Sequence, residues 1–398
     1  MRIGILTYHD EVNYGSLLQA YAMQTALSDL GRDAEIIDRW FQPHQERIYG
    51  ILHSHSFRAW IKWLLRCAWG TGAWSLFLRQ WRSRRFIKHK LKLTPYHFHD
   101  SEDAPRDLGV DLITVGSDQV WHPKAQPQVY LLNELKQVPG IAYAASFGAN
   151  IIPKEMEELY RKGFQNFKAI GIREREGVEI ARRLGASSAT HVVDPTILVD
   201  PERWLEFIGG TIRRTRRKHI ACYFLAEDFL DLAEKLGQWA KKNDLVVDLF
   251  VQDFSVPFLR FRPCGSKWLK YWKCRLGYPL RFRYAAGPVE FVRKIASADC
   301  VFTNSFHALM FSMIFKRNVR IVKPSSQIRK GMAARMQEFS GTIITGPFIM
   351  ETLEEAFTSY ERGEEVHYDE AELKRRREES EAWLKKAIAA AKGPVNGR

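Results

Sequence analysis

Cysteine is scarce in this 398-residue sequence, and its placement excludes two common kinds of site. The five cysteines are scattered, and none forms a CxxC pair. Neither a zinc knuckle nor a disulfide framework is therefore supported, and the cysteines indicate a reducing cytoplasm. The apolar run at the N-terminus ends at Tyr8, before an acidic segment, and is too short for a secretory signal peptide.

Long hydrophobic runs are also missing. The longest apolar stretch extends from Cys67 to Leu78 and contains two glycines, which is too short to cross a bilayer. We therefore expect a cytoplasmic protein that is soluble or peripheral, with a place at the inner face of the cytoplasmic membrane as one option.

Acidic residues are absent from two long stretches. Eleven lysines and arginines lie between Arg47 and His99, and eight lie between Phe254 and Val289. The net charge of +14 is thus concentrated in two basic patches. No RNA- or DNA-binding motif accompanies them, so nucleic acid is not an expected partner. A non-enzymatic nucleic-acid binder is the rival from another class, and it predicts a steep salt dependence.

Several catalytic motifs do not occur. The chain has no G-x-S-x-G elbow, no H-E-x-x-H, no D-x-D and no clustered His and carboxylate residues at ligand spacing. These absences favour a metal-independent reaction.

Short apolar segments alternate with helical periodicity in two series along the chain, which predicts an α/β protein. The first series begins with a buried strand at 2–8 and a helix at about 16–30, and the second begins after Pro201. We expect two Rossmann-like domains facing a central cleft, with ligands at the carboxyl ends of the strands. The predicted segments are a first domain at 1–195 with a basic helical insertion at about 51–93, a second domain at 196–350, and charged C-terminal helices with a tail at 351–398.

Two strand-to-loop junctions in the first half carry small or polar residues where a parallel sheet binds ligands. The segment containing Asn13, Gly15 and Ser16 opens a helix and could bind an anion through free N–H groups, or could simply be a capped helix. The second junction follows strand 111–115 and either lines the cleft or caps a helix. On the cleft or acceptor side we place Gly116, Ser117, Asp118 and Trp121, together with Ser146 after strand 141–145.

Two further junctions carry the residues best suited to chemistry. Arg173 directly follows an apolar run, and a cation at a strand end favours an anionic ligand, although a surface arginine is the simpler alternative. His307 follows strand 299–303 at the start of a helix, after Asn304 and Ser305, which are good N-cap residues. Capping does not explain His307, whose side chain type titrates near neutral pH, although a lone histidine is more often structural than catalytic.

Seven segments, in order from residue 7 to about 340, together resemble the polysaccharide pyruvyl transferase family. They read TYHDEVNYGSLLQAYAMQTAL, RRFIKHKLKLT, DLITVGSDQVWHP, IAYAASFG, GIREREGVE, VVDPTILVD and DCVFTNSFHALMFSMIF, with a weaker match at AARMQEF. The resemblance implies a glycosyltransferase-B-like arrangement, phosphoenolpyruvate as donor, a catalytic His307, and contact between Arg173 and the donor. Many members have Arg where this chain has Ser305, and Arg335 could supply the missing charge.

The implied reaction forms a pyruvate ketal on a sugar of a cell-surface polysaccharide or its lipid-linked precursor, and it needs no cofactor. The trianionic donor needs cationic or N–H-rich contacts, for which Arg173, Arg335, the start of the first helix, Asn304 and Ser305 are candidates. Lipid-linked acceptors and the basic, tryptophan-rich stretches suggest peripheral contact with an anionic membrane. The alternative is a nucleotide-sugar-dependent glycosyltransferase of the same fold.

Overall fold

A computed structural model describes residues 1–10, 12–40, 73–99, 104–105, 107–125, 127–135, 137–212, 216–225, 228–251, 265–323, 336 and 340–391. The chain divides into two compact units, each built from segments distant in sequence. The first contains Met1–Phe41, Phe86–Asp200 and Asp369–Arg398, and the second contains Gln42–Arg85 and Pro201–Tyr368. Arg335, like Arg58, Lys62 and Arg66 of the basic insertion, lies outside the described residues.

The first unit is built on a seven-stranded parallel sheet with the order β3-β2-β1-β4-β5-β6-β7. Its strands are β1 (Arg2–Leu6), β2 (Asp33–Arg39), β3 (Leu93–Phe98), β4 (Leu112–Val115), β5 (Gly140–Ala145), β6 (Phe167–Ile172) and β7 (Thr190–His191). The short apolar strands β1, β4 and β5 are buried almost throughout, as expected for the middle of a parallel sheet. The strand order reverses between β1 and β4, and such a switch point is where open α/β sheets bind ligands.

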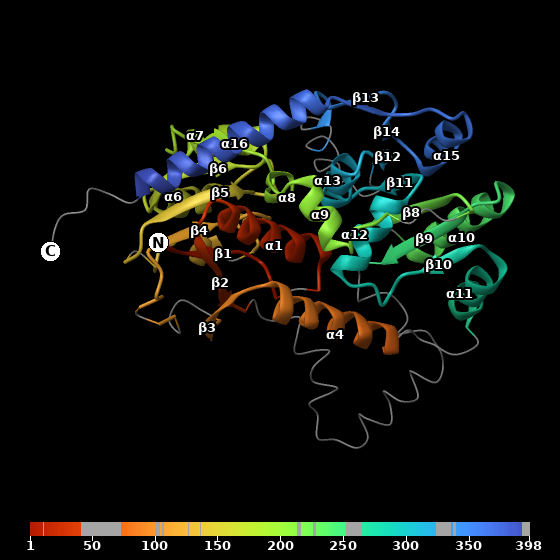
Figure 1. The fold of residues 1–398 in the computed structure, drawn as a ribbon, viewed down its shortest axis with the longest axis horizontal. Helices are drawn as coiled ribbons and strands as arrows, with labels where there is room; N and C mark the ends of the chain where they lie inside the picture. The colour runs from red at the N-terminus through yellow and green to blue at the C-terminus, as the bar shows by residue number, and fades with distance from the viewer. Residues whose placement is uncertain are drawn as a thin grey trace, which may run out of the picture. The chain divides into compact units, whose positions relative to one another are not determined.

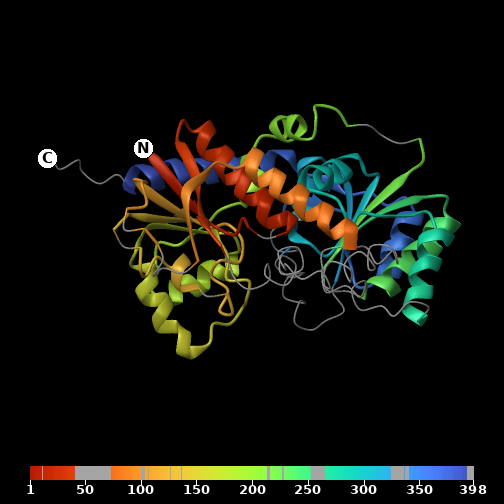
Figure 2. The same ribbon diagram turned by 90° about the horizontal axis from the view of Figure 1, so that it is seen from below.

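Helices cover both faces of this sheet. They are α1 (Tyr14–Asp29), α5 (Pro127–Tyr130), α6 (Lys154–Phe164), α7 (Arg175–Arg183), α8 (Pro195–Leu198) and α16 (Glu370–Ala391). Figure 2 shows α1 and α16 on one face and α6 on the other. The unit boundary falls within a further helix, α4 (Ala73–Lys90).

The C-terminal helix α16 returns to the first unit although it follows the second in sequence (Figure 1). Its buried stripe includes Leu384 and Ile388, and the Trp383 ring packs against Gly171 of β6. The Val193 N–H also donates to Ser380 Oγ at 3.0 Å. The apolar stripe therefore makes this charged helix an integral part of the first unit.

The second unit has a six-stranded parallel sheet of order β10-β9-β8-β11-β12-β14. Its strands are β8 (His219–Phe224), β9 (Val246–Val251), β10 (Leu280–Phe282), β11 (Cys300–Thr303), β12 (Asn318–Val322) and β14 (Ile349–Met350), with an antiparallel pair of β13 (Ile344–Thr345) and β15 (His367–Tyr368). Its helices are α9 (Pro201–Phe207), α10 (Phe229–Lys242), α11 (Ser266–Gly277), α12 (Pro288–Ser297), α13 (Phe306–Ile314) and α15 (Leu353–Glu361). Trp239 stacks on Phe357 and packs against Phe302 in its core.

Both units have the Rossmann-like α/β architecture expected from the sequence, so the predicted fold class is confirmed. The predicted domains were continuous segments, whereas the observed units are discontinuous: Asp369–Arg398 belongs to the first unit, and Gln42–Arg85 belongs to the second. Edge strand β3 was not expected, since Pro95 and exposed polar residues interrupt its apolar pattern. Among the described helices, none is long and apolar enough to cross a membrane.

Gly116 allows a stability test of the turn after β4. Its φ is +107°, and a Cβ there would lie 2.5 Å from the Tyr143 carbonyl oxygen. Gly185 has φ +102° but no atom within 4 Å of a built Cβ. We expect Gly185→Ala to cost about 1–2 kcal/mol through φ alone, and Gly116→Ala to cost about 1–3 kcal/mol more through steric overlap. Thermal and denaturant unfolding measure both, and equal losses would contradict the clash.

Candidate active site

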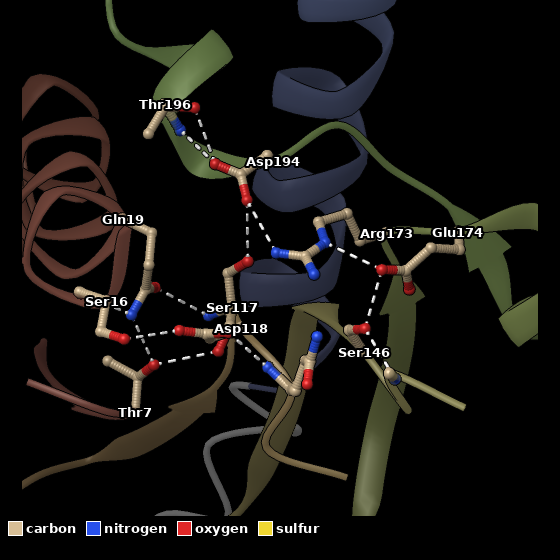
Figure 3. Close-up of polar contacts among 12 residues, drawn as sticks. Thr7, Ser16, Gln19, Ser117, Asp118, Ser146, Arg173, Glu174, Asp194 and Thr196 are labelled. Atoms are coloured by element: carbon tan, nitrogen blue, oxygen red, sulfur yellow. Dashed lines mark hydrogen bonds and ion pairs between the residues drawn. The ribbon is translucent and has the colours of Figure 1, made fainter. Parts of the chain in front are cut away.

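A buried polar cluster occupies the carboxyl edge of the first unit's sheet, at the ends of β1, β4, β5 and β6 and just after β7 (Figure 3). Its members come from six separate chain segments and point toward one another. They are Thr7, Ser16, Gln19, Ser117, Asp118, Ser146, Arg173, Glu174, Asp194 and Thr196.

Arg173 occupies the centre of two ion pairs. Its Nε lies 3.0 Å from Glu174 Oε1, and its Nη1 lies 3.3 Å from Asp194 Oδ2. Only 5% of the Arg173 side chain is exposed. Burial alone would lower the pKa of the guanidinium, but the nearby carboxylates of Glu174 and Asp194 outweigh it and raise that pKa. Arg173 is therefore a permanent cation with two structural partners.

Asp194 is fully buried and uses both carboxylate oxygens. Oδ1 accepts from the Thr196 amide at 3.0 Å and from Thr196 Oγ1 at 2.7 Å, which caps α8. Oδ2 accepts from Ser117 Oγ at 3.1 Å in addition to Arg173. Asp194 thus connects the end of β4 to the end of β6.

Gln19 of α1 connects the two strands at the switch point. Its Nε2 donates to Thr7 Oγ1 at 2.9 Å, and its Oε1 accepts from the Ser117 amide at 3.2 Å. Thr7 Oγ1 in turn donates to the Ser117 carbonyl at 3.0 Å. Buried polar groups need such partners, and these bonds fix the backbone at the point where a ligand would approach.

The remaining cluster residues make the site acidic. Ser16 Oγ donates to Asp118 Oδ2 at 2.8 Å, and Ser146 Oγ donates to Glu174 Oε1 at 2.7 Å. In the described part of the cluster, three carboxylates thus surround the single guanidinium of Arg173. A net negative charge disfavours an anionic ligand, whereas carboxylate oxygens accept hydrogen bonds from hydroxyl groups.

The second unit presents His307 at the carboxyl end of β11. His307 is half-buried in the first turn of α13. Ser305 occupies the N-cap position, but its side chain makes no capping bond, and the first turn contains no acidic residue. Asn304 bonds instead to the Leu225 backbone, accepting from its N–H at 2.6 Å and donating to its carbonyl at 3.1 Å. Asn304 therefore joins β8 to β11, and Ser305 does not cap α13 through its side chain.

These features accompany a clear family match. Residues 13–326 match the family model described as polysaccharide pyruvyl transferase. The chain belongs to this family. A search of the curated proteins found no match.

Solved structures with a similar fold include three UDP-N-acetylglucosamine 2-epimerases. The Rickettsia bellii enzyme is 9% identical, with a TM-score of 0.53, over 99% of this chain and 97% of that chain. The Methanocaldococcus jannaschii enzyme is 10% identical, with a TM-score of 0.50, over 91% and 92%. The Neisseria meningitidis enzyme, solved with UDP-GlcNAc bound, is 8% identical, with a TM-score of 0.50, over 98% and 100%. At these identities the likeness concerns the fold alone.

One predicted acceptor-side residue of this pyruvyl transferase belongs to the core. Trp121 is fully buried, packs against Phe147 and Phe164, and donates its indole N–H to the Tyr130 carbonyl at 3.0 Å. The prediction for Trp121 was wrong, because the loop after β4 turns the ring into the hydrophobic core. Gly116, also buried, serves the turn through its positive φ.

The other predicted residues fall into separate groups. The structure brings Ser16, Ser117, Asp118, Ser146 and Arg173 into the cluster of Figure 3. The Asn13 side chain caps α1 by accepting from the Gly15 amide at 2.9 Å.

Sequence reasoning missed five members of the cluster: Thr7, Gln19, Glu174, Asp194 and Thr196. Asp194 has a recognisable signal, since it directly precedes Pro195 at a helix start after a strand. Gln19 lies inside a helix of evenly apolar character and offers no comparable signal.

The paired arginine can be tested against a neighbour. Arg173→Ala leaves the buried Asp194 and Glu174 carboxylates without their counter-charge, which should cost about 3–5 kcal/mol. Arg175→Ala removes an exposed arginine two residues away and should change stability by less than about 0.5 kcal/mol. Denaturant unfolding followed by circular dichroism gives both values. Similar stabilities for the two variants would show that the Arg173 ion pairs are not structural.

Proposed function

We propose that this pyruvyl transferase moves pyruvate from phosphoenolpyruvate to a sugar of a cell-surface glycan, forming a pyruvate ketal without a metal ion or cofactor. The observation that carries the proposal is the family match across residues 13–326. The chemistry of the two strand-end sites supports it, because one suits an anion and the other suits hydroxyl groups.

The donor fits the start of α13. The helix dipole favours an anion at a helix N-terminus, and no acidic residue lies in this first turn. We assign the phosphate to the N-terminal end of α13, with His307 beside the reacting carbons. Arg335, outside the described residues, and Arg173 remain proposed donor contacts, and the carboxylate partners of Arg173 make it the weaker of the two.

The reaction needs one positioned acid–base group. A proton adds to the methylene carbon of phosphoenolpyruvate, and a sugar hydroxyl forms a bond to the neighbouring carbon. The carbon–oxygen bond to phosphate then breaks, and a second hydroxyl of the same sugar closes the ketal. The two sugar hydroxyls give up two protons. One restores the proton that the acid–base group gave to the methylene carbon, and the other leaves with phosphate. We assign these transfers to the His307 imidazole.

The acceptor fits the acidic cluster of the first unit. Asp118 is half-buried, so its carboxylate can accept a hydrogen bond from a sugar hydroxyl. Ser117 and Ser146 hold Asp194 and Glu174 in place through their hydroxyls. We therefore propose Asp118 as the direct acceptor contact and the two serines as positioning residues.

A lipid-linked acceptor would bring the enzyme to the cytoplasmic face of the membrane. In the second basic stretch, α11 exposes Leu269 by 56% and Leu276 by 78%, seven residues apart on one side of the helix. Exposed Lys267 and Arg275 accompany them. Apolar and basic side chains together favour an anionic membrane surface.

His307→Gln should lower ketal formation by roughly 10²–10⁴-fold, because the acid–base group is lost. The fold should persist, since the residue is only half-buried. The substrates are phosphoenolpyruvate and candidate lipid-linked sugars. The rate is measured as the phosphate released and as the sugar-bound pyruvate that mild acid sets free. The exposed His367 of the same unit provides a control, and His367→Gln should keep full activity. Near wild-type turnover of His307→Gln would remove His307 from the mechanism.

The same assay separates the rival function. A nucleotide-sugar-dependent glycosyltransferase would release UDP from UDP-GlcNAc and ignore phosphoenolpyruvate. Phosphate release that depends on both phosphoenolpyruvate and sugar, and that continues after chelation of metal ions, is the expected result. Sugar-dependent UDP release alone would replace the proposal with the rival.

Membrane contact should appear as sedimentation with anionic vesicles that weakens with salt, at about 1 kcal/mol for each engaged cation. Reversing the charge of Arg58, Lys62 and Arg66 should release the protein, and Leu269→Ser with Leu276→Ser should weaken binding further. Turnover on a soluble acceptor should stay unchanged in both variants. Wild-type protein that remains in the supernatant at low salt would exclude this contact.

A further inference from the structure

An exposed tryptophan stands at the carboxyl edge of the first unit's sheet, outside the polar cluster of Figure 3. Trp40 directly follows β2, and 39% of it is exposed. His97 of the neighbouring strand β3 stacks on its ring, with centroids 5.2 Å apart and planes inclined by 23°. His99 meets the indole edge-on at 5.8 Å. Three rings thus gather where two parallel strands end, which is the ligand-binding edge of such a sheet.

Hydrogen bonds hold the indole in this exposed position. Trp40 Nε1 donates to Asp38 Oδ1 at 2.9 Å, and the same oxygen lies 2.9 Å from His9 Nε2. The other ring nitrogen of His9 lies 3.2 Å from the Thr7 carbonyl oxygen. The hydrogen bonds of Asp38 in the described chain use Oδ1 or its backbone amide, which leaves Oδ2 open to a ligand.

The ring group is connected to the polar cluster. Thr7, whose carbonyl faces His9, donates through Oγ1 to the Ser117 carbonyl and accepts from Gln19. Ser117 adjoins Asp118, the proposed acceptor contact. A continuous set of hydrogen bonds therefore runs along the sheet edge from Trp40 to the residue before Asp118.

We infer that Trp40 is a stacking platform for a pyranose ring of the acceptor glycan, with Asp38 Oδ2 accepting from one of its hydroxyls. A pyranose has an apolar C–H face that packs on an aromatic ring, while its hydroxyls bond to polar groups at the rim. The Asp38 carboxylate disfavours an anion such as the donor at this place. A single ring bordered by histidines is also smaller than the apolar patches that bind proteins. The inference rests on the proposed function, since it names the subsite for the acceptor of that reaction.

The test measures sugar binding without the donor. Dissociation constants of the methyl β-glycosides of galactose, glucose and N-acetylmannosamine are determined by saturation-transfer NMR. We expect Trp40→Ala to weaken the best-bound glycoside at least about tenfold, and Trp40→Phe, which keeps an aromatic face, to weaken it less. Trp81→Ala removes another exposed tryptophan, 48% exposed on α4, and should leave binding unchanged.

Turnover provides a second readout. With any acceptor that is converted, Trp40→Ala should raise the KM for the sugar and leave the KM for phosphoenolpyruvate unchanged. Equal affinities of Trp40→Ala and wild type, or no binding of any of the three glycosides to the wild type, would overturn the platform. The binding assay contains no phosphoenolpyruvate. Sugar binding at Trp40 can therefore be judged even if the proposed transfer reaction proves wrong.

Discussion

The ion pairs of Arg173 with Asp194 and Glu174 tie together the carboxyl edge of the first sheet. A charge that is 95% removed from solvent loses its hydration and must be compensated by partners in fixed positions. Asp194 extends the arrangement to Ser117 after β4, and Glu174 extends it to Ser146 after β5. The positions of four strand ends thus depend on one buried cation. An arginine at a strand end can serve this purpose before it serves a ligand.

The strand ends of the two units differ in charge. The first unit surrounds its cation with carboxylates, so its strand ends are acidic and suited to hydroxyl groups. In the second unit, α13 begins without an acidic residue or a side-chain cap and carries His307 in its first turn. A reaction that joins an anionic donor to a polyhydroxyl acceptor requires both kinds of surface. The proposed assignment of donor to the second unit and acceptor to the first rests on this difference.

The sequence predicted most of the regular structure because the strands are short, apolar and buried, and glycine or polar residues mark their ends. Strand β1 and helix α1 show this within the first thirty residues. The pattern predicted a charged C-terminal helix that packs back on the molecule but not the unit it joins, since that depends on a sparse apolar stripe in a highly charged segment. Edge strand β3 was missed for a related reason, because half-exposed strands lack a continuous apolar run.

The sequence predicted where the site residues lie along the sheet edge, but not which residues they bond to. Residues directly after buried strands, such as Ser117 and Arg173, do meet at one edge, because parallel strands end together. Which of them bond to each other depends on loop paths that periodicity does not encode. Trp121 and Trp40 illustrate the point, since both lie just beyond strands of one sheet. The loop after β4, in which Asp118 has φ +71°, turns Trp121 into the core, where the Tyr130 carbonyl accepts its N–H. Trp40 finds its N–H acceptor in Asp38 at the surface, and its ring therefore stays exposed. An exposed ring held by a carboxylate departs from the usual burial of tryptophan, and such departures from local rules concentrate at functional sites.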